Sequence, residues 1–318
     1  MIEQFKQLQT ALARHSTVAI VTHIRPDGDA LGSSLAMKRY CDARGISARA
    51  YCFDDTPAYL AFLPDTQQIA HTQDDFWDSA EAYLIVDCGD RSMIGSAHDA
   101  LNEAKPVYVI DHHATNQGYG AVNVINPDAS ATAEIIHQLF IHTGHAINHE
   151  VATQLFTGIY TDTDSFTNLG TTPGALSSSS ELLARGAQFK DIMANTMRSK
   201  TIPALKLWGL ALSRLRLDRE KGIAVTVLRR DDLETCHAKP EDMEGVANLL
   251  NHLADVSMSM VLREMGDGTV KGSLRTTSDR VDVSKVAQLL GGGGHAKAAG
   301  FTVKGSVVES PEGWKIVE

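Results

Sequence analysis

Three short, uninterrupted runs of apolar residues constrain the fold of this chain more than any other feature. They span residues 18–21, 83–86 and 107–110, and each run leads directly into polar or acidic residues. Continuous apolar runs of this length are typical of strands buried on both faces, as in a parallel sheet with helical crossovers. Apolar residues recur at helical spacing over residues 30–44 and 131–144. The sequence therefore predicts an α/β fold, with a parallel sheet and helices on both faces.

The length of the chain predicts more than one domain. Its 318 residues exceed the usual size of a single domain, and the pattern changes after about residue 200. We expect residues 1–195 to form the parallel-sheet domain and residues 196–214 to form a linker that includes a helix. Strand patterns around a helical stretch at residues 244–254 predict a smaller α+β domain over residues 215–318.

Charge and cysteine content limit the partners and the compartment. The formal net charge is -10, whereas proteins that follow long nucleic acids usually carry a basic stripe, so only a short polyanion remains a plausible partner. The four cysteines form no CxxC pair, the N-terminus lacks a signal-peptide pattern, and no apolar run approaches the roughly 18 residues of a membrane span. We expect reduced thiols, a cytoplasmic location and no membrane partner.

Acidic residues and histidines follow each predicted strand. His23, Asp27 and Asp29 form an H-x-x-x-D-x-D pattern in which Gly28 permits a tight turn. In open α/β sheets the functional crevice lies beyond the carboxyl ends of the strands, where these residues fall. Any one of the acids could simply cap a helix, but helix capping alone does not account for the whole cluster.

The later strands and one helix end add further candidate ligands: Asp87, Asp111, His112, His113 and Asp162. Burying this many carboxylates without cations would be costly through repulsion and desolvation. Carboxylate and imidazole ligands favour ions such as Mn²⁺ or Mg²⁺ over structural zinc. We therefore expect a centre for two divalent ions, with Asp164 as a competitor of Asp162.

A glycine run near the C-terminus has two interpretations. Residues 291–295 read Gly-Gly-Gly-Gly-His and follow a helical pattern, so they could be a flexible helix end. Alternatively, the glycines let backbone N–H groups approach an anion while His295 adds a directed contact.

Four segments, taken in order, resemble the motifs of the DHH phosphoesterase family. They are residues 23–30 (His-Ile-Arg-Pro-Asp-Gly-Asp-Ala), Asp87, residues 111–113 (Asp-His-His) and residues 161–163 (Thr-Asp-Thr). Residues 273–275 (Ser-Leu-Arg), the glycine run and residues 298–300 (Ala-Ala-Gly) resemble the DHH-associated C-terminal domain. The most similar branch is the nanoRNase and pAp-phosphatase group.

The resemblance implies a role for each matching residue. One manganese ion would be held by His23, Asp27 and Asp87, and the other by Asp29, Asp87, His112 and Asp162, with Mg²⁺ or Co²⁺ as alternatives. His113 would face the substrate, and Asp111 would orient the histidines. Arg275 would hold a substrate phosphate, while Gly293, Gly294 and His295 would embrace the terminal nucleotide.

The resemblance also implies a hydrolase that uses hydroxide shared by two metals. Its expected substrates are oligonucleotides of about two to five nucleotides, dinucleotides or 3'-phosphoadenosine 5'-phosphate (pAp). The alternatives are a cyclic or linear dinucleotide phosphodiesterase, an inorganic pyrophosphatase and a non-catalytic nucleotide-binding regulator. The sequence does not decide between RNA and DNA, nor does it give the polarity of cleavage. It also leaves the oligomeric state open, with a homodimer as one option.

Overall fold

The computed structural model describes residues 1–196, 201–254, 256–310 and 313–317. The chain divides into two compact units, Met1–Ser199 and Lys200–Glu318. The predicted linker, residues 196–214, includes residues 197–200, which lie outside the described residues. It also includes helix α9 (Ile202–Ser213), which packs on strand β7 (Ile223–Leu228) of the second unit.

The first unit is built on a five-stranded parallel sheet with the order β2-β1-β3-β4-β5. The strands are β1 (Thr17–Val21), β2 (Ser47–Tyr51), β3 (Ala82–Val86), β4 (Val107–Asp111) and β5 (Val122–Ile125). The central strands β1, β3 and β4 contain the three apolar runs. Every residue of β3 is buried, as expected for a strand covered on both faces.

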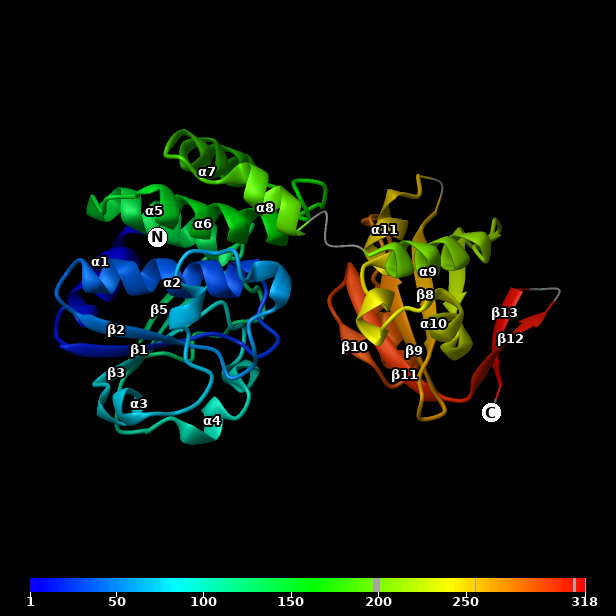
Figure 1. Cartoon of the computed structure of the whole chain (residues 1–318), viewed down its shortest axis with the longest axis horizontal. Helices are drawn as coiled ribbons and strands as arrows, with labels where there is room; N and C mark the ends of the chain where they lie inside the picture. The colour runs from blue at the N-terminus through cyan, green and yellow to red at the C-terminus, as the bar shows by residue number, and fades with distance from the viewer. Residues whose placement is uncertain (197–200, 255, 311–312, 318) are drawn as a thin grey trace. The chain divides into compact units, whose positions relative to one another are not determined.

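Helices cover both faces of this sheet (Figure 1). Alternate residues of β1 show the division, because Val18 and Ile20 join one core and Ala19 and Val21 join the other. The first core contains residues of α1, α2, α5 and α6, and also of α7 and α8, which form an outer layer on these helices. The second core contains residues of α3 and α4. The α-helices are α1 (Ile2–Leu12), α2 (Gly28–Asp42), α3 (Asp75–Ser79), α4 (Ala97–Ala100), α5 (Thr132–Thr143), α6 (His149–Asp162), α7 (Pro173–Ala184) and α8 (Phe189–Thr196). This confirms the predicted α/β architecture.

The second unit contains a six-stranded mixed sheet with the order β10-β11-β9-β8-β7-β6 and a separate hairpin, β12-β13. Besides β7, the strands are β6 (Arg216–Asp218), β8 (Met258–Glu264), β9 (Thr269–Arg275), β10 (Gly293–Gly294), β11 (Ala298–Lys304), β12 (Ser306–Ser310) and β13 (Gly313–Val317). Besides α9, its α-helices are α10 (Arg230–Cys236), α11 (Val246–Leu249) and α12 (Val283–Leu289). The predicted smaller α+β domain is confirmed.

One predicted helix is wrong in extent. The stretch at residues 244–254 contains only α11, followed by a 3-10 turn at Leu250–His252. Gly245 precedes α11 with φ +91°, so the chain bends sharply just before this short helix. Further 3-10 turns are Ala58–Leu60, Thr66–Gln68, Arg91–Ile94 and Pro240–Met243. Among the described residues, no helix has the length and apolar character needed to cross a membrane.

Candidate metal centre

The turn between β1 and α2 carries His23 and Asp27, and the first turn of α2 carries Asp29. Asp27 is the N-cap residue of α2, and its Oδ1 accepts hydrogen bonds from two amides of the first turn, each at 3.0 Å. The cap holds the Asp27 and Asp29 carboxylates at the same end of the helix. Gly28 is needed because an added Cβ would lie 2.4 Å from Thr161 Oγ1 on α6.

Asp87 follows β3 directly and is only 2% exposed. Its backbone amide donates to the carbonyl of Ile110 at 2.9 Å, and its φ of +60° lies in the left-handed region. Asp87 Oδ2 lies 3.5 Å from His23 Nε2, and Oδ1 lies 3.7 Å from His112 Nε2. One carboxylate therefore faces a histidine on each side.

The end of β4 supplies a chain of hydrogen bonds. Asp111 is fully buried, and its Oδ1 lies 2.7 Å from His113 Nδ1. Asn116 Nδ2 donates to the other oxygen of Asp111 at 2.7 Å. His112 Nδ1 lies 3.3 Å from the carbonyl of Ala129, which leaves Nε2 of His112 directed toward the carboxylates. These contacts orient both imidazoles.

Asp162 ends α6, and its Oδ2 lies 3.3 Å from His112 Nε2. Asp164 is exposed and has φ +49°, because the chain turns sharply after the helix. The structure thus brings Asp162, and not Asp164, to the cluster.

Within the described residues, three groups of side chains have potential metal-ligand atoms within 4.8 Å of one another. Asp87 and His112 each belong to two of them, so the groups form one connected cluster. The groups are His23, Asp27 and Asp87; Asp29, His112 and Asp162; and Asp87, His112 and His113.

Crowding of carboxylates dominates the electrostatics of this cluster. Burial and the nearby charge of Asp87 raise the pKa of Asp29 and of Asp162 well above the usual value. Burial also opposes the ionisation of Asp87, but its hydrogen bond with His23 and the surrounding histidines lower its pKa to about 2. Burial would lower the pKa of His23, yet Asp87 and Asp27 raise it to about 9.

These residues fit divalent cations. The cluster combines four carboxylates with imidazole nitrogens, which is the ligand chemistry of Mn²⁺ and similar ions. The raised pKa values of Asp29 and Asp162 express the cost of holding several buried carboxylates together, and cations would offset that cost.

Three supporting residues were not predicted from the sequence. Ser33 Oγ donates to Asp29 Oδ1 at 3.1 Å, Thr132 contacts both Asp29 and Asp87, and Asn116 contacts Asp111. The Asn116 contact is nearly local in sequence. No local sequence pattern points to Thr132, because its contact with Asp29 joins residues that are 103 positions apart.

The predicted substrate-binding residues lie in the second unit. Arg275 ends β9, and its Nε donates to Asn248 Oδ1 at 3.1 Å. Gly293 and Gly294 form β10, whose partner is β11, and His295 is exposed beside them. A Cβ on Gly294 would lie 2.6 Å from Ala299 Cα, whereas one on Gly293 would meet nothing within 4 Å. Packing against β11 therefore requires glycine at position 294, whereas a side chain at position 293 would meet no neighbouring atom.

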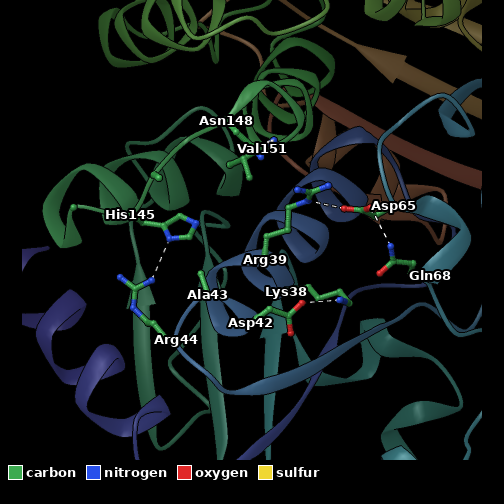
Figure 2. A pocket seen from close by; sticks show the side chains of 12 residues that line it. Lys38, Arg39, Asp42, Ala43, Arg44, Asp65, Gln68, His145, Asn148 and Val151 are labelled. Atoms are coloured by element: carbon green, nitrogen blue, oxygen red, sulfur yellow. Dashed lines mark hydrogen bonds and ion pairs between the residues drawn. The ribbon is translucent and has the colours of Figure 1, made fainter.

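A separate hollow of about 770 Å³ lies at the other end of α2, beside the loop between α5 and α6 (Figure 2). None of the predicted site residues lines it. Its charges are largely satisfied, since Lys38 Nζ lies 2.7 Å from Asp42 Oδ2 and Arg39 Nε lies 2.6 Å from Asp65 Oδ2 (Figure 2). The acidic and histidine cluster, not this hollow, has the chemistry of a reactive site.

Each of the two units matches a known domain family. Residues 17–159 match the DHH family, N-terminal domain, and residues 221–311 match the DHHA1 domain. The matched ranges cover all of the cluster except Asp162, together with the glycine run and Arg275.

Individual relatives match along nearly the whole chain. The bifunctional oligoribonuclease and PAP phosphatase NrnA of Thermus thermophilus is 32% identical over 91% of this chain and 84% of its own. The cyclic-di-AMP phosphodiesterase PdeA of Listeria monocytogenes is 26% identical over 96% of this chain but only 47% of its own. The crystal structure of an exopolyphosphatase-related protein from Bacteroides fragilis is 25% identical, with a TM-score of 0.89, over 96% of this chain and 92% of its own.

Proposed function

Because the chain belongs to the DHH family of phosphoesterases, we propose that it is a manganese-dependent hydrolase of short oligonucleotides and pAp. The relative from Thermus thermophilus carries both activities in its name and is similar over both units. The observation that supports the proposal most strongly is that Asp87 belongs to two donor groups, with its two oxygens facing different histidines. A carboxylate shared in this way suits a pair of adjacent metal ions.

The placement of the side chains supports a two-metal mechanism. His23, Asp27 and Asp87 would hold one ion, and Asp29, Asp87, His112 and Asp162 the other. Two such ions, when bound, would lower the pKa of water toward neutrality and offset the charge of phosphoryl oxygens. The two oxygens of Asp87 face different histidines, which suits a carboxylate shared between the two sites.

His113 is the proposed substrate-facing residue. Its Nδ1 is engaged by Asp111 at 2.7 Å, so Nε2 is left to donate a hydrogen bond to a phosphoryl oxygen or to the leaving oxygen. Asn116 holds Asp111 from the other side and so keeps the histidine in place. These contacts reduce the motion of the donor before the substrate binds.

A substrate series tests the proposal. Purified, Mn²⁺-loaded protein would be given RNA and DNA oligomers of increasing length, pAp and pyrophosphate, and products would be quantified by ion-exchange chromatography. We expect kcat/KM to be highest for the shortest oligomers and for pAp. The Asp87→Ala protein, purified in the same way, controls for contaminating nuclease. Undiminished activity on long strands, or turnover of pyrophosphate alone, would contradict the proposal.

A second candidate activity is hydrolysis of cyclic dinucleotides. The similarity to the Listeria phosphodiesterase extends over 96% of this chain and supports it. Cyclic di-AMP and its linear product pApA belong in the same series. A higher kcat/KM for cyclic di-AMP than for pApA and pAp would favour this second activity over the first.

The proposed substrate-binding role of the glycine run has its own test. Because a Cβ on Gly293 meets no atom within 4 Å, Gly293→Ala should fold normally and raise KM for pAp by about 10-fold through obstruction of the backbone. Gly266→Ala is the matched control, since its Cβ also meets nothing and it lies in the turn between β8 and β9. Equal KM values for the two variants would argue against a substrate contact at Gly293.

We also propose the cytoplasm as the place of action. The four cysteines, Cys41, Cys52, Cys88 and Cys236, are buried and free. Burial raises the pKa of the Cys88 thiol, which lies next to Asp87. Free thiols of this kind suit a reducing compartment. Cell fractionation with an antibody to the chain would test the location.

A further inference from the structure

Thr132 touches two carboxylates of the cluster at once. It is the first residue of α5, and its side chain is fully buried. Its backbone amide donates to Asp29 Oδ2 at 2.6 Å, and its hydroxyl donates to Asp87 Oδ1 at 2.9 Å. Asp29 and Asp87 belong to different donor groups, so Thr132 links the group of Asp29 to those of Asp87.

The start of α5 depends on this contact. The N-cap residue, Ala131, has no side chain that could accept a hydrogen bond from the first turn. Asp29 accepts instead, from the amide of Thr132 and from the amide of Ala133 at 2.8 Å. A carboxylate from α2 therefore caps α5, and the positive end of the α5 dipole favours its charged form.

The hydroxyl of Thr132 constrains Asp87 in a similar way. An ionised carboxylate can only accept, so the Thr132 hydroxyl must donate its single proton to Asp87 Oδ1. The other oxygen of Asp87 faces His23 at 3.5 Å. The Asp87 backbone is left-handed, and contacts of this kind help to hold such a conformation in place.

We propose that Thr132 is a positioning residue that sets the separation and orientation of Asp29 and Asp87 for a pair of divalent ions. This inference rests on the proposed function in one respect, since it takes the cluster to be a metal centre. Thr132 itself supplies no ligand atom in any of the three donor groups. Residues of this kind typically change metal affinity by about 10- to 100-fold when they are lost.

Two substitutions separate the hydroxyl from the shape of the side chain. Thr132→Val keeps the shape and the backbone amide but removes the hydroxyl, whereas Thr132→Ser keeps the hydroxyl. The matched control is Thr157→Val on α6, because Thr157 is equally buried but its hydroxyl donates to a backbone carbonyl, that of Thr153, at 2.8 Å. Thr132→Ala removes the same hydroxyl without placing a methyl group beside Asp87, should the valine variant fail to fold.

Binding of Mn²⁺ itself is the measurement, made by titration calorimetry and by the electron paramagnetic resonance signal of free Mn²⁺. We expect Thr132→Val and Thr132→Ala to weaken Mn²⁺ binding by about 10- to 100-fold, and Thr132→Ser and Thr157→Val to bind within about threefold of the wild type. Wild-type affinity in Thr132→Val or Thr132→Ala overturns the proposal. Equal weakening in Thr132→Ser overturns it too, since the hydroxyl would then not be responsible.

The result can be distinguished from a failure of the proposed function. A wild-type protein that binds Mn²⁺ but hydrolyses neither oligonucleotides nor pAp would contradict the proposed substrates, and the Thr132 comparison would still decide its own question. A wild-type protein that binds no Mn²⁺ would contradict the metal centre and the role of Thr132 together.

Discussion

Asp87 combines a left-handed backbone with an almost fully buried carboxylate between two histidines. Asparagine tolerates the left-handed region as well as aspartate does, so Asp87→Asn should keep the fold and remove only the charge. We expect kcat/KM to fall by more than about 100-fold and Mn²⁺ stoichiometry to drop below two, because the shared carboxylate is lost. Steady-state kinetics and metal analysis of the purified protein would measure both.

Asp164→Asn is the control for that variant, since Asp164 also has a positive φ but is exposed and lies outside the donor groups. It should retain the activity and the metal content of the wild type. A loss of activity and of bound Mn²⁺ in Asp164→Asn would contradict its place outside the donor groups.

His145 offers a pH-dependent test at the residue scale. Burial and the adjacent Arg44 guanidinium lower its pKa from 6.5 to about 4. The unfolded chain therefore binds a proton at His145 between about pH 6.5 and 4 while the folded chain does not, so folding stability falls as the pH falls through this window. Solvent screening of the partly exposed ring limits the effect to about 1 kcal/mol.

Urea unfolding of the chelated wild type and of His145→Gln at pH 7.5 and pH 4.5 would measure this contribution. The variant lacks the titrating ring, so the wild type should lose more stability than the variant on acidification. Equal losses would show that His145 titrates alike in both states.

The residues of the candidate centre could be predicted because the motifs are local in sequence. His23, Asp27 and Asp29 lie on one turn, and Asp111, His112 and His113 are consecutive. The preference for Asp162 over Asp164 rested on the family resemblance alone, since the position of each carboxylate depends on where α6 ends. The contact between Thr132 and Asp29 spans 103 residues and follows from the packing of α5 against α2, which no local pattern specifies.

At the scale of elements, α2 and α6 approach so closely that glycine is required between them. A Cβ on Gly158 of α6 would lie 2.6 Å from Asp29 Oδ1 and 2.6 Å from Ala133 Cβ. Gly158→Ala should therefore destabilise the fold by about 1–3 kcal/mol through overpacking, although alanine normally favours a helix. It should also displace Asp29 and weaken Mn²⁺ binding.

Gly209→Ala is the matched control because Gly209 lies inside α9 and an added Cβ meets nothing within 4 Å. That variant should gain up to about 1 kcal/mol from helix propensity alone. Urea denaturation of both variants gives the comparison, and a stabilised Gly158→Ala protein would contradict the close approach of the helices.

The central strands of the first unit were predictable and the edge strands were not, for one physical reason. β1, β3 and β4 are buried on both faces and appear as continuous apolar runs. β2 contains exposed Ser47 and Arg49, and β5 is mostly half-buried, so neither shows a distinct apolar pattern. The overestimate at residues 244–254 has a related cause, because apolar spacing does not reveal the bend at Gly245.

At the scale of the whole molecule, all proposed metal ligands belong to the first unit, while the second unit has its own apolar cores. A ligand that binds only the folded form of one unit stabilises that unit by mass action. We therefore expect calorimetric unfolding to show two transitions, of which only one responds to Mn²⁺. At 100 times its dissociation constant, each bound ion should add about 2.7 kcal/mol.

For a unit of this size, that stabilisation corresponds to an upward shift of about 5–10 °C for each bound ion in the transition of the first unit. Differential scanning calorimetry with MnCl₂ and with a chelator would measure the shift, and Asp87→Asn identifies the transition, because the shift should be lost there. Equal shifts of both transitions, or a shift that Asp87→Asn leaves intact, would contradict the location of the ions. Since the shift depends on binding rather than turnover, it tests the metal centre whichever phosphoester proves to be the substrate.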